Sequence, residues 1–432
     1  MSQQLQSTDH IWHPFTQMKT ADAPIQIVRA KDCALHALDG KIYIDAISSW
    51  WVNIHGHANE YIASAIAQQA QTLEQVIFAG FTHQPAIDLS KTLIRLLPSG
   101  FSKVFFSDDG STSVEVAIKM AFQYWHNQGS THKTKLIAFE NAYHGDTFGA
   151  MSAGGRSTFN AAFQQQLFEV FHIPLPTKDN IEAVSAQFKK IAEQDTVAAF
   201  IFEPLVQGAA GMQMYEAAHL DKLIGLAKEH NILCIADEVM TGFGRTGTVF
   251  AIEQLEQSPD IICLSKGITG GFLPLGVTVS TQHIYDAFYA DDVTKTFFHG
   301  HSYTANPLAC AAANASMHLL QQESCKDQIR FIGLQHQSFA KNIALQPMVK
   351  STRQTGTILA IELQTGEAGS YFNSIRQHAY RFYIDQGVLL RPLGNVVYIM
   401  PPYCITAAEL QRVYDVIALS LDFLQQSGTT TA

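Results

Sequence analysis

The sequence predicts an α/β fold with a mostly parallel sheet, because apolar runs of strand length alternate with helical patterns over residues 103–280. The runs are almost continuously apolar, as expected for strands that helices cover on both faces. They are Lys103 to Phe106, Lys135 to Phe139, Val197 to Phe202, Ile232 to Ala236 and Ile261 to Leu264. The chain has 432 residues and exceeds the roughly 250 to 300 residues at which a single core stops growing. We therefore expect two domains.

Two segments between these runs show one apolar face at helical spacing. The first face is formed by Val114, Ala117, Ile118, Ala121, Phe122 and Trp125, and the second by Leu220, Leu223, Ile224 and Ala227. These helices and the five strands form the predicted large domain, which we place at residues 56–322.

The two ends of the chain show a different pattern. Gln26 to Ile47 contains short alternating runs around Asp39-Gly40, which indicates a β-hairpin. From about Glu323 onwards, helical patterns mix with short strand-like runs such as Thr357 to Leu363 and Val396 to Met400. We therefore predict a smaller α+β domain that combines residues 1–55 with residues 323–432.

Composition argues against several classes of function. The 28 Lys and Arg residues are outnumbered by 38 Asp and Glu residues, which give a net charge of −10, so nucleic acid is not an expected partner. No stretch approaches the 18 apolar residues of a membrane span, and residues 1–8 do not have the pattern of a signal peptide. The six cysteines show no CxxC spacing, as is common for reduced thiols. We expect a cytoplasmic protein that does not bind membranes.

Asp237 and Lys266 each follow an apolar strand run, Ile232 to Ala236 and Ile261 to Leu264. In open α/β sheets, ligands bind at the carboxyl ends of the strands. A carboxylate and an amine at this edge suit pyridoxal phosphate (PLP), with the lysine bonded to the cofactor aldehyde and the aspartate next to the ring nitrogen. The alternative interpretations are a helix cap or surface ion pair for Asp237 and a solvated side chain for Lys266.

Residues after two other strands could complete such a site. Ser107 to Glu115 follows the strand that ends at Phe106, and Thr112 with Glu115 fits a capping box. The N–H groups of Gly110, Ser111 and Thr112 would then be available to a phosphate, although an ordinary helix cap is the simpler interpretation.

Tyr143 could stack on a flat heterocycle, the alternative being a tyrosine in the core. Glu203 and Gln207, which follow the strand that ends at Phe202, could reach the cofactor ring.

Two rival functions have weaker support. Gly242-Phe-Gly244-Arg-Thr-Gly247 matches the dinucleotide pattern G-x-G-x-x-G, but five residues separate it from the strand and no amphipathic helix opens at Gly247. His55-Gly-His57 and His299-Gly-His301 could suggest a metal. Since the HExxH and CxxC patterns are absent, we predict no metal site.

Several motifs together resemble class III PLP-dependent aminotransferases. The first is Asp237-Glu-Val-Met-Thr-Gly-Phe-Gly-Arg-Thr-Gly247 followed by Lys266. Further motifs are similar to the biotin-pathway branch of this family: Trp12 to Met18, Ser48 to Trp51, Tyr143 to Ser152, Asn306 to Ala313, Arg391-Pro392 and Met400 to Tyr403. The resemblance covers nearly the whole chain. It implies the type I PLP-dependent transferase fold, with a seven-stranded sheet in the large domain, and a homodimer.

The resemblance also implies roles for individual residues. Lys266, Asp237 and Tyr143 match catalytic positions that also bind the cofactor, and Gly110 and Ser111 match the phosphate site. His301 and Ser302 would reach that phosphate from the partner subunit. The substrate-binding positions are Phe15, Trp50, Tyr143, Lys266, Gly300 and Arg391.

The implied activity is transfer of an amino group from S-adenosylmethionine to 8-amino-7-oxononanoate, which gives 7,8-diaminononanoate in biotin biosynthesis. Phe15 stands where many of these enzymes have a tyrosine, and Ser302 replaces the more usual threonine. Because of Phe15, lysine remains an alternative amino donor. Another class III ω-aminotransferase, acting on ornithine or a β- or γ-amino acid, is a further alternative, and a non-enzymatic PLP-binding scaffold is a third.

Overall fold

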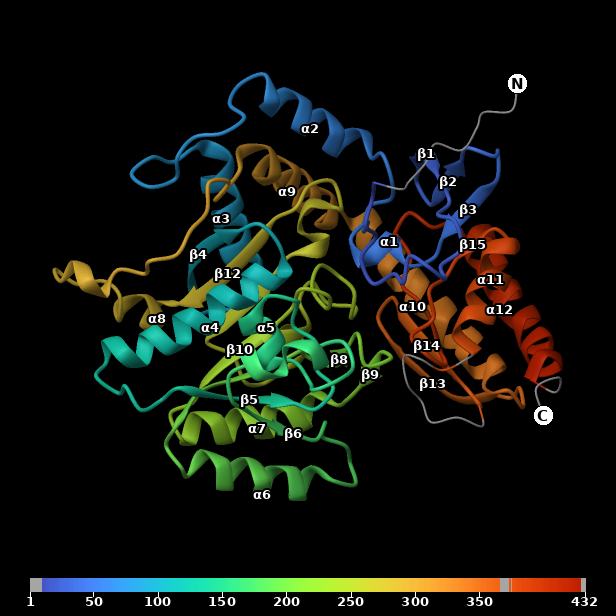
Figure 1. Ribbon diagram of the computed structural model, residues 1–432. Helices are drawn as coiled ribbons and strands as arrows, with labels where there is room; N and C mark the ends of the chain where they lie inside the picture. Colours follow the sequence, from blue (N-terminus) through green and yellow to red (C-terminus); the bar gives the residue numbers. More distant parts are fainter. Residues whose placement is uncertain (1–9, 366–372, 374, 429–432) are drawn as a thin grey trace.

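A seven-stranded sheet forms the centre of the larger of two units of the protein (Figure 1). The computed structural model describes residues 10–365, 373 and 375–428. The strand order is β4-β12-β11-β10-β7-β5-β6. All neighbouring pairs are parallel except those of β12, which runs antiparallel to β4 and β11. The predicted mostly parallel sheet is confirmed. Its strands are β4 (Phe101–Ser107), β5 (Lys135–Phe139), β6 (Val170–Ile173), β7 (Val197–Phe202), β10 (Leu233–Asp237), β11 (Ile261–Leu264) and β12 (Gly276–Thr281).

Helices cover both faces of this sheet, and alternate residues of each strand pack against opposite faces. In β10, Leu233 and Ile235 join the core beneath α4 and α5, whereas Cys234 and Ala236 join the core beneath α6 and α7. The helices of this part are α2 (Glu60–Ala70), α3 (Gln84–Leu96), α4 (Gly110–Asn127), α5 (Phe148–Ala153), α6 (Ile181–Ala192), α7 (Ala217–Glu229), α8 (Gln282–Asp286) and α9 (Pro307–Leu320). Short elements are the 3-10 turns η1 (Ala161–Gln166), η2 (Ala251–Gln254), η3 (Lys266–Thr269) and η4 (Val293–Lys295), and the β8 (Val206–Gln207) and β9 (Gln213–Met214) hairpin.

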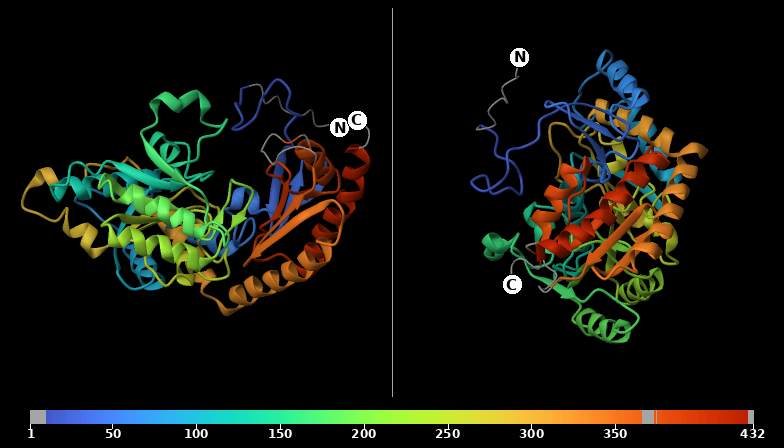
Figure 2. Two further views of the ribbon diagram at one scale, coloured as in Figure 1. Left: turned by 90° about the horizontal axis from the view of Figure 1, so that it is seen from below. Right: turned by 90° about the vertical axis from the view of Figure 1, so that its right-hand side faces the viewer.

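The described parts of the N-terminal and C-terminal segments, the blue and the red ribbon of Figure 2, build a second unit beside the large sheet. The four-stranded sheet β1-β2-β3-β15 joins them, because Ile44 pairs with Val388. The hairpin predicted around Asp39-Gly40 is confirmed as β2 and β3. The strands are β1 (Ile27–Lys31), β2 (Ala34–Ala37), β3 (Ile42–Asp45), β15 (Val388–Leu389) and, in a three-stranded sheet, β13 (Val349–Thr355), β14 (Ile358–Leu363) and β16 (Val396–Ile399). The helices are α1 (Ser48–Trp51), α10 (Glu323–Ile343), α11 (Ile375–Asp385) and α12 (Ala407–Gly428).

Buried hydrogen bonds connect this smaller unit to the large sheet. Arg245 donates to the carbonyl oxygens of Pro401 (2.8 Å) and Trp51 (3.3 Å), and the hydroxyl of Tyr403 donates to the carbonyl of Phe243 (2.7 Å). These contacts place the turn that carries Trp51 next to the carboxyl ends of the large sheet. The domain boundaries at residues 55/56 and 322/323 stay a prediction.

Candidate active site

A cavity of about 660 Å³ lies at the carboxyl ends of the large-sheet strands. Its walls come from the segments that follow these strands, as the position of polar residues after apolar runs predicts. Trp51 and Val52 add a wall from the smaller unit. The other lining residues are Asp108 to Ser111 after β4, Tyr143 to Thr147 after β5, Glu203 after β7, Asp237 and Val239 to Thr241 at the end of β10, Ser265 and Lys266 after β11, and Gly271 to Leu275 before β12.

Asp237 is the last residue of β10 and is only 5% exposed. Its Oδ1 accepts the N–H of Val239 at 3.0 Å, and its Oδ2 lies 2.7 Å from Nδ1 of His144. A carboxylate only accepts hydrogen bonds, so Nδ1 of His144 carries the proton. The contact fixes the orientation of Asp237 in the cavity.

His144 is a site residue to which sequence reasoning assigned no role. Burial by itself lowers its pKa, but the hydrogen bond to Asp237 and the charges of Asp237 and Glu203 outweigh burial and raise the pKa of His144 above its ordinary value. Its Nε2 is buried without a hydrogen-bond partner. The available signal was its position, since it directly follows Tyr143 at the edge where ligands bind.

Lys266 opens the turn η3 with a backbone φ of +38°, a conformation that residues other than glycine rarely adopt. Its Nζ lies 5.1 Å from the centre of the Trp51 ring. Burial lowers the pKa of the Lys266 amine, against the opposing charges of Asp237 and Glu203. The strained backbone and the lowered pKa both distinguish Lys266 from a solvated surface lysine.

The N-terminus of α4 forms a narrow cradle at the cavity. A Cβ added to Gly110 would lie 2.6 Å from Cγ1 of Val239, and a Cβ added to Gly145 would collide with Ser111. The hydroxyl oxygen of Ser111 accepts the N–H of Thr147 at 2.9 Å. The backbone at the N-terminus of α4 therefore lies close to the cavity. An anion that binds at a helix N-terminus requires such close approach of the backbone.

The capping box predicted for Thr112 and Glu115 is wrong. The N-cap is Asp109, whose carboxylate accepts the N–H of Thr112 at 2.8 Å, while the Thr112 hydroxyl accepts the N–H of Asp109 at 3.0 Å. Glu115 instead accepts hydrogen bonds from Thr147 and Ala150. The helix begins earlier than predicted because an aspartate next to glycine is itself a strong cap.

Tyr143 lines the cavity and is bound at both ends: its N–H donates to Glu203 (3.1 Å) and its hydroxyl donates to Asp146 (3.0 Å). Burial raises the pKa of the Tyr143 hydroxyl, and it raises that of Glu203 to about 7. Gln207 does not line the cavity, because its amide donates to the carbonyl oxygen of Glu140 at 3.1 Å. Of the two residues predicted to reach the cofactor ring, only Glu203 is therefore at the cavity.

Three predicted substrate-binding residues meet outside the cavity. The Phe15 and Trp50 rings are 5.7 Å apart, and the Arg391 guanidinium carbon lies 5.1 Å from the Trp50 ring centre. Trp50 is 43% exposed, so this cluster is open to a ligand. Trp51, its neighbour in α1, is the one that lines the cavity.

Gly300, His301 and Ser302 lie between η4 and α9 and do not line the cavity of their own chain. The carbonyl of Ser302 accepts a hydrogen bond from Gln75 at 2.5 Å, and the N–H of His301 donates to Thr304 at 3.1 Å. Nε2 of His301 is buried without a partner. Their expected contribution to a partner's site stays a prediction.

The histidines and glycines that suggested a metal or a dinucleotide site have other places in the fold. Nε2 of His55 lies 3.0 Å from a backbone carbonyl, and Nε2 of His57 lies 2.8 Å from Asp45. In the part of the chain that the structure describes, no three His, Cys, Asp or Glu side chains gather in a way that could hold a metal ion. Gly242 and Gly244 lie in a buried turn that ends at the exposed Gly247, and only the short η2 follows. No described helix is long and apolar enough to cross a membrane.

The residues at the cavity fit PLP. The glycine cradle at α4 suits a phosphate, Asp237 with its histidine partner suits a protonated ring nitrogen, and the amine of Lys266 suits the aldehyde. The Tyr143 ring at the cavity wall suits a flat heterocycle.

Comparisons with known proteins agree with this fit. A family model described as aminotransferase class-III matches residues 16–421. The adenosylmethionine-8-amino-7-oxononanoate aminotransferase of Synechococcus elongatus is 50% identical over 426 residues, which cover 96% of this chain and 99% of that protein.

Two solved structures are also similar. The enzyme of the same description from Methanocaldococcus jannaschii has a TM-score of 0.90 at 34% identity, covering 96% of this chain and 97% of that one. An amine transaminase from an uncultivated Pseudomonas species, solved with PLP bound, has a TM-score of 0.90 at 29% identity, covering 97% and 99%. The predicted type I fold is confirmed.

Proposed function

Because the chain belongs to the class III aminotransferase family, we propose that it transfers an amino group from S-adenosylmethionine to 8-amino-7-oxononanoate, giving 7,8-diaminononanoate in biotin biosynthesis. The observation that carries the proposal is the 50% identity, over 96% of the chain, to a relative named for these two substrates. The cavity that joins Lys266 with Asp237 supports the chemistry.

The cofactor, PLP, supplies an aldehyde for amine exchange and a ring that withdraws electrons from the substrate. Gly110 and Ser111 would hold its phosphate, the Tyr143 ring would lie against its face, and Asp237 would pair with its ring nitrogen. The Nδ1–H of His144 keeps Asp237 oriented toward the cavity. At an effective dielectric near 20, a carboxylate about 4 Å from a cation contributes roughly 4 kcal/mol, enough to keep a pyridine protonated.

Lys266 acts on protons at its Nζ. Because burial lowers its pKa, a larger fraction of the amine is neutral and able to accept a proton from a substrate carbon, then return it at a neighbouring atom. The Trp51 ring lies beside Nζ and would limit the access of water to this exchange. Outside the cavity, Arg391 next to Trp50 would pair with a substrate carboxylate.

We also propose that the protein is a homodimer in which His301 and Ser302 complete the partner's phosphate site. The position of these residues away from the cavity of their own chain supports this arrangement. The six cysteines carry free thiols, which supports a reducing compartment such as the cytoplasm.

A half-reaction screen tests the proposed substrates. Purified protein loaded with PLP is mixed separately with S-adenosylmethionine, lysine and ornithine, and the visible absorbance of the cofactor is followed. We expect S-adenosylmethionine to discharge the absorbance and 8-amino-7-oxononanoate to restore it. If only lysine discharges the cofactor absorbance, lysine is the amino donor. If only ornithine discharges it, the biotin-pathway assignment is refuted.

A further inference from the structure

The turn that carries Trp50 and Trp51 has a strained backbone. Ser48, Ser49 and Trp51 have φ angles of +52°, +58° and +71°, and none of them is glycine. Such conformations persist only where the surrounding contacts enforce them. The contacts that enforce this turn therefore determine where the two tryptophan rings lie.

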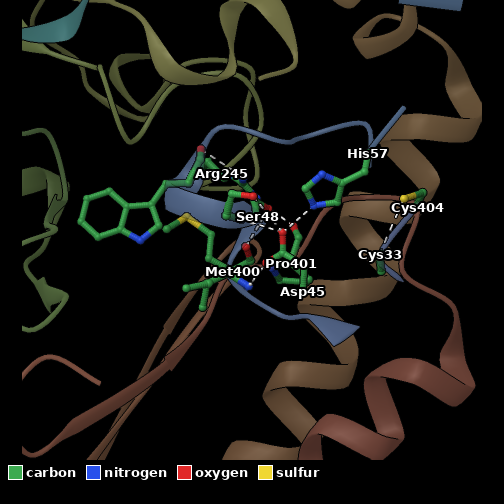
Figure 3. Close-up of polar contacts among 11 residues, drawn as sticks. Cys33, Asp45, Ser48, His57, Arg245, Met400, Pro401 and Cys404 are labelled. Carbon is green, nitrogen blue, oxygen red and sulfur yellow. Dashed lines mark hydrogen bonds and ion pairs between the residues drawn. The ribbon is translucent and has the colours of Figure 1, made fainter. Parts of the chain in front are cut away.

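One buried carboxylate makes most of these contacts. Asp45, the last residue of β3, is 0% exposed. Its Oδ1 accepts the N–H of Ile47 at 3.1 Å, and its Oδ2 accepts the N–H of Ser49 at 2.6 Å and the Ser49 hydroxyl at 3.3 Å. The same Oδ2 accepts the Nε2–H of His57 at 2.8 Å. Figure 3 shows the side chains of Asp45 and His57 pointing toward each other, close to Ser48 of the turn.

The partners of Asp45 are themselves fixed. The N–H and C=O of His57 are both bonded to the backbone of Asp32, at 2.8 and 3.0 Å. The far side of the turn is held by the Ser48 hydroxyl, which donates to the carbonyl of Met400 at 2.9 Å (Figure 3). The turn thus rests on rigid backbone, with Asp45 as the charged group at its centre.

The turn leads directly into the site. The Trp51 indole N–H donates to the Tyr398 hydroxyl at 2.9 Å, and its ring lines the cavity beside Lys266. The Trp50 ring contacts Arg391. A small shift of the turn would move both rings, whereas the cofactor contacts on the large sheet would stay in place.

We propose that Asp45, together with His57, is a positioning residue that holds the turn at residues 48–51 and so sets the substrate-facing positions of Trp50 and Trp51. The substrate side of this inference rests on the proposed function. Asp45 touches neither the cavity nor the reacting groups, so its effect passes through the turn.

The first test is Asp45→Asn, which keeps the shape but replaces one accepting oxygen with an amide that cannot accept. We expect KM for both substrates to rise between about 10- and 100-fold, with a smaller change in kcat. The matched control is Asp260→Asn. Asp260 is 17% exposed, accepts the N–H of Cys234 at 2.7 Å and lies 3.5 Å from His283, but it precedes β11 at the edge away from the cavity. Unchanged KM in Asp45→Asn would overturn the proposal.

A double-mutant cycle separates positioning from general destabilisation. In a Trp50→Phe/Trp51→Phe background, Asp45→Asn should add less than about a threefold further increase in KM. If Asp45→Asn raises KM by the same factor in this background as in the wild type, Asp45 does not act through the turn. A conservative pair gives a second check: His57→Gln keeps a donor for Asp45 and should retain KM, whereas His57→Leu should raise it.

A fluorescence measurement tests the turn without relying on turnover. In full-length protein with Trp12→Phe and Trp125→Phe, the remaining two of the four tryptophans are those of the turn. Asp45→Asn should increase their quenching by acrylamide at least about twofold in the folded protein with or without PLP. Unchanged quenching would overturn the proposal, even if Asp45→Asn fails to turn over. Wild-type protein that is inactive with the named substrates would instead refute the proposed function and leave this readout valid.

Discussion

Lys266 combines a backbone conformation that few side chains adopt with a pKa that burial lowers. An amine in this environment is neutral more often than a surface lysine, and only a neutral amine can attack a carbonyl carbon or accept a proton. The carboxylates of Asp237 and Glu203 oppose the shift, so the balance of burial and charge sets the reactivity of Nζ.

Replacement of this amine gives the first prediction. Lys266→Ala should lower the rate of amino transfer by at least about 10³-fold, because no other group would replace its proton transfer. The protein should keep its thermal stability and bind PLP non-covalently. Lys222→Ala, which removes an exposed lysine paired with Glu182, serves as the control and should retain full activity. Substantial steady-state transamination by Lys266→Ala would refute the assigned role.

Glu238 gives a pH-dependent prediction that is independent of the cavity. Burial raises its pKa from 4.5 to about 7 in the folded protein, while its carboxyl accepts hydrogen bonds from Ile252 and Thr241. Because the folded state binds this proton more tightly than the unfolded state, the group contributes stability below pH 4.5 that is lost as pH rises through 7. The shift corresponds to about 3 kcal/mol.

The measurement is urea unfolding of wild type and Glu238→Gln at pH 5 and pH 8. Between pH 5 and pH 8, the free energy of unfolding should fall by about 2 to 3 kcal/mol more in the wild type than in the variant. Other carboxyl groups contribute equally to both proteins and cancel. An equal pH dependence in the two proteins would mean that Glu238 ionises normally in the fold.

At the scale of elements, the N-terminus of α4 lies where the large sheet borders the cavity. Asp109 caps the helix, while Gly110 allows Val239 from the β10 side to approach the first turn. A β-branched valine has few alternative rotamers, so it cannot easily make room for an added methyl group. The close approach of the two segments is therefore a property of their packing, and glycine is required at position 110.

Two glycine replacements test this packing. Gly110→Ala should destabilise the protein by about 1 to 3 kcal/mol through overpacking, and should speed the loss of PLP on dialysis. Gly225→Ala is the matched control: Gly225 lies inside α7, and a Cβ there would meet nothing within 4 Å. This control should stabilise the protein by about 0.5 to 1 kcal/mol. Equal effects of the two variants on thermal unfolding would argue against the close contact.

At the scale of the whole molecule, the site is assembled from distant parts of the chain. The smaller unit contributes Trp51, and the buried Arg245 ties the backbone of this unit to the large sheet. The stretch at residues 300–302 lies outside the cavity, so a second subunit is needed if these residues are to bind phosphate.

Mixing two inactive variants tests the shared site. Lys266→Ala lacks the amine, and the double variant His301→Ala/Ser302→Ala lacks the proposed phosphate contacts. If these contacts act across the interface, random exchange of subunits should restore about a quarter of wild-type activity, because half of the dimers are mixed and each has one complete site. Mixtures that stay inactive after proven subunit exchange would place the contacts within one chain.

Much of the site was accessible from sequence because parallel strands end at a common edge. The apolar runs before Asp237, Lys266 and Glu203 predicted strands, and the structure brings all three residues to one cavity. The motifs then identified the family. Local rules were less reliable at the start of α4: the capping-box pattern pointed to Thr112, whereas the folded helix is capped by Asp109.

The sequence by itself indicated five strands of the large sheet, the residues that follow them and the family, because these depend on periodicity and on order along the chain. It did not reveal β6 or the antiparallel β12. Only the tertiary structure decided which partners these residues have. His144 reaches Asp237 across 93 positions, Gln207 donates to Glu140 away from the cavity, and Asp45 supports the tryptophan turn through His57. Such contacts join segments far apart in the chain, and hydrogen bonds between them depend on distances and angles that no local pattern encodes.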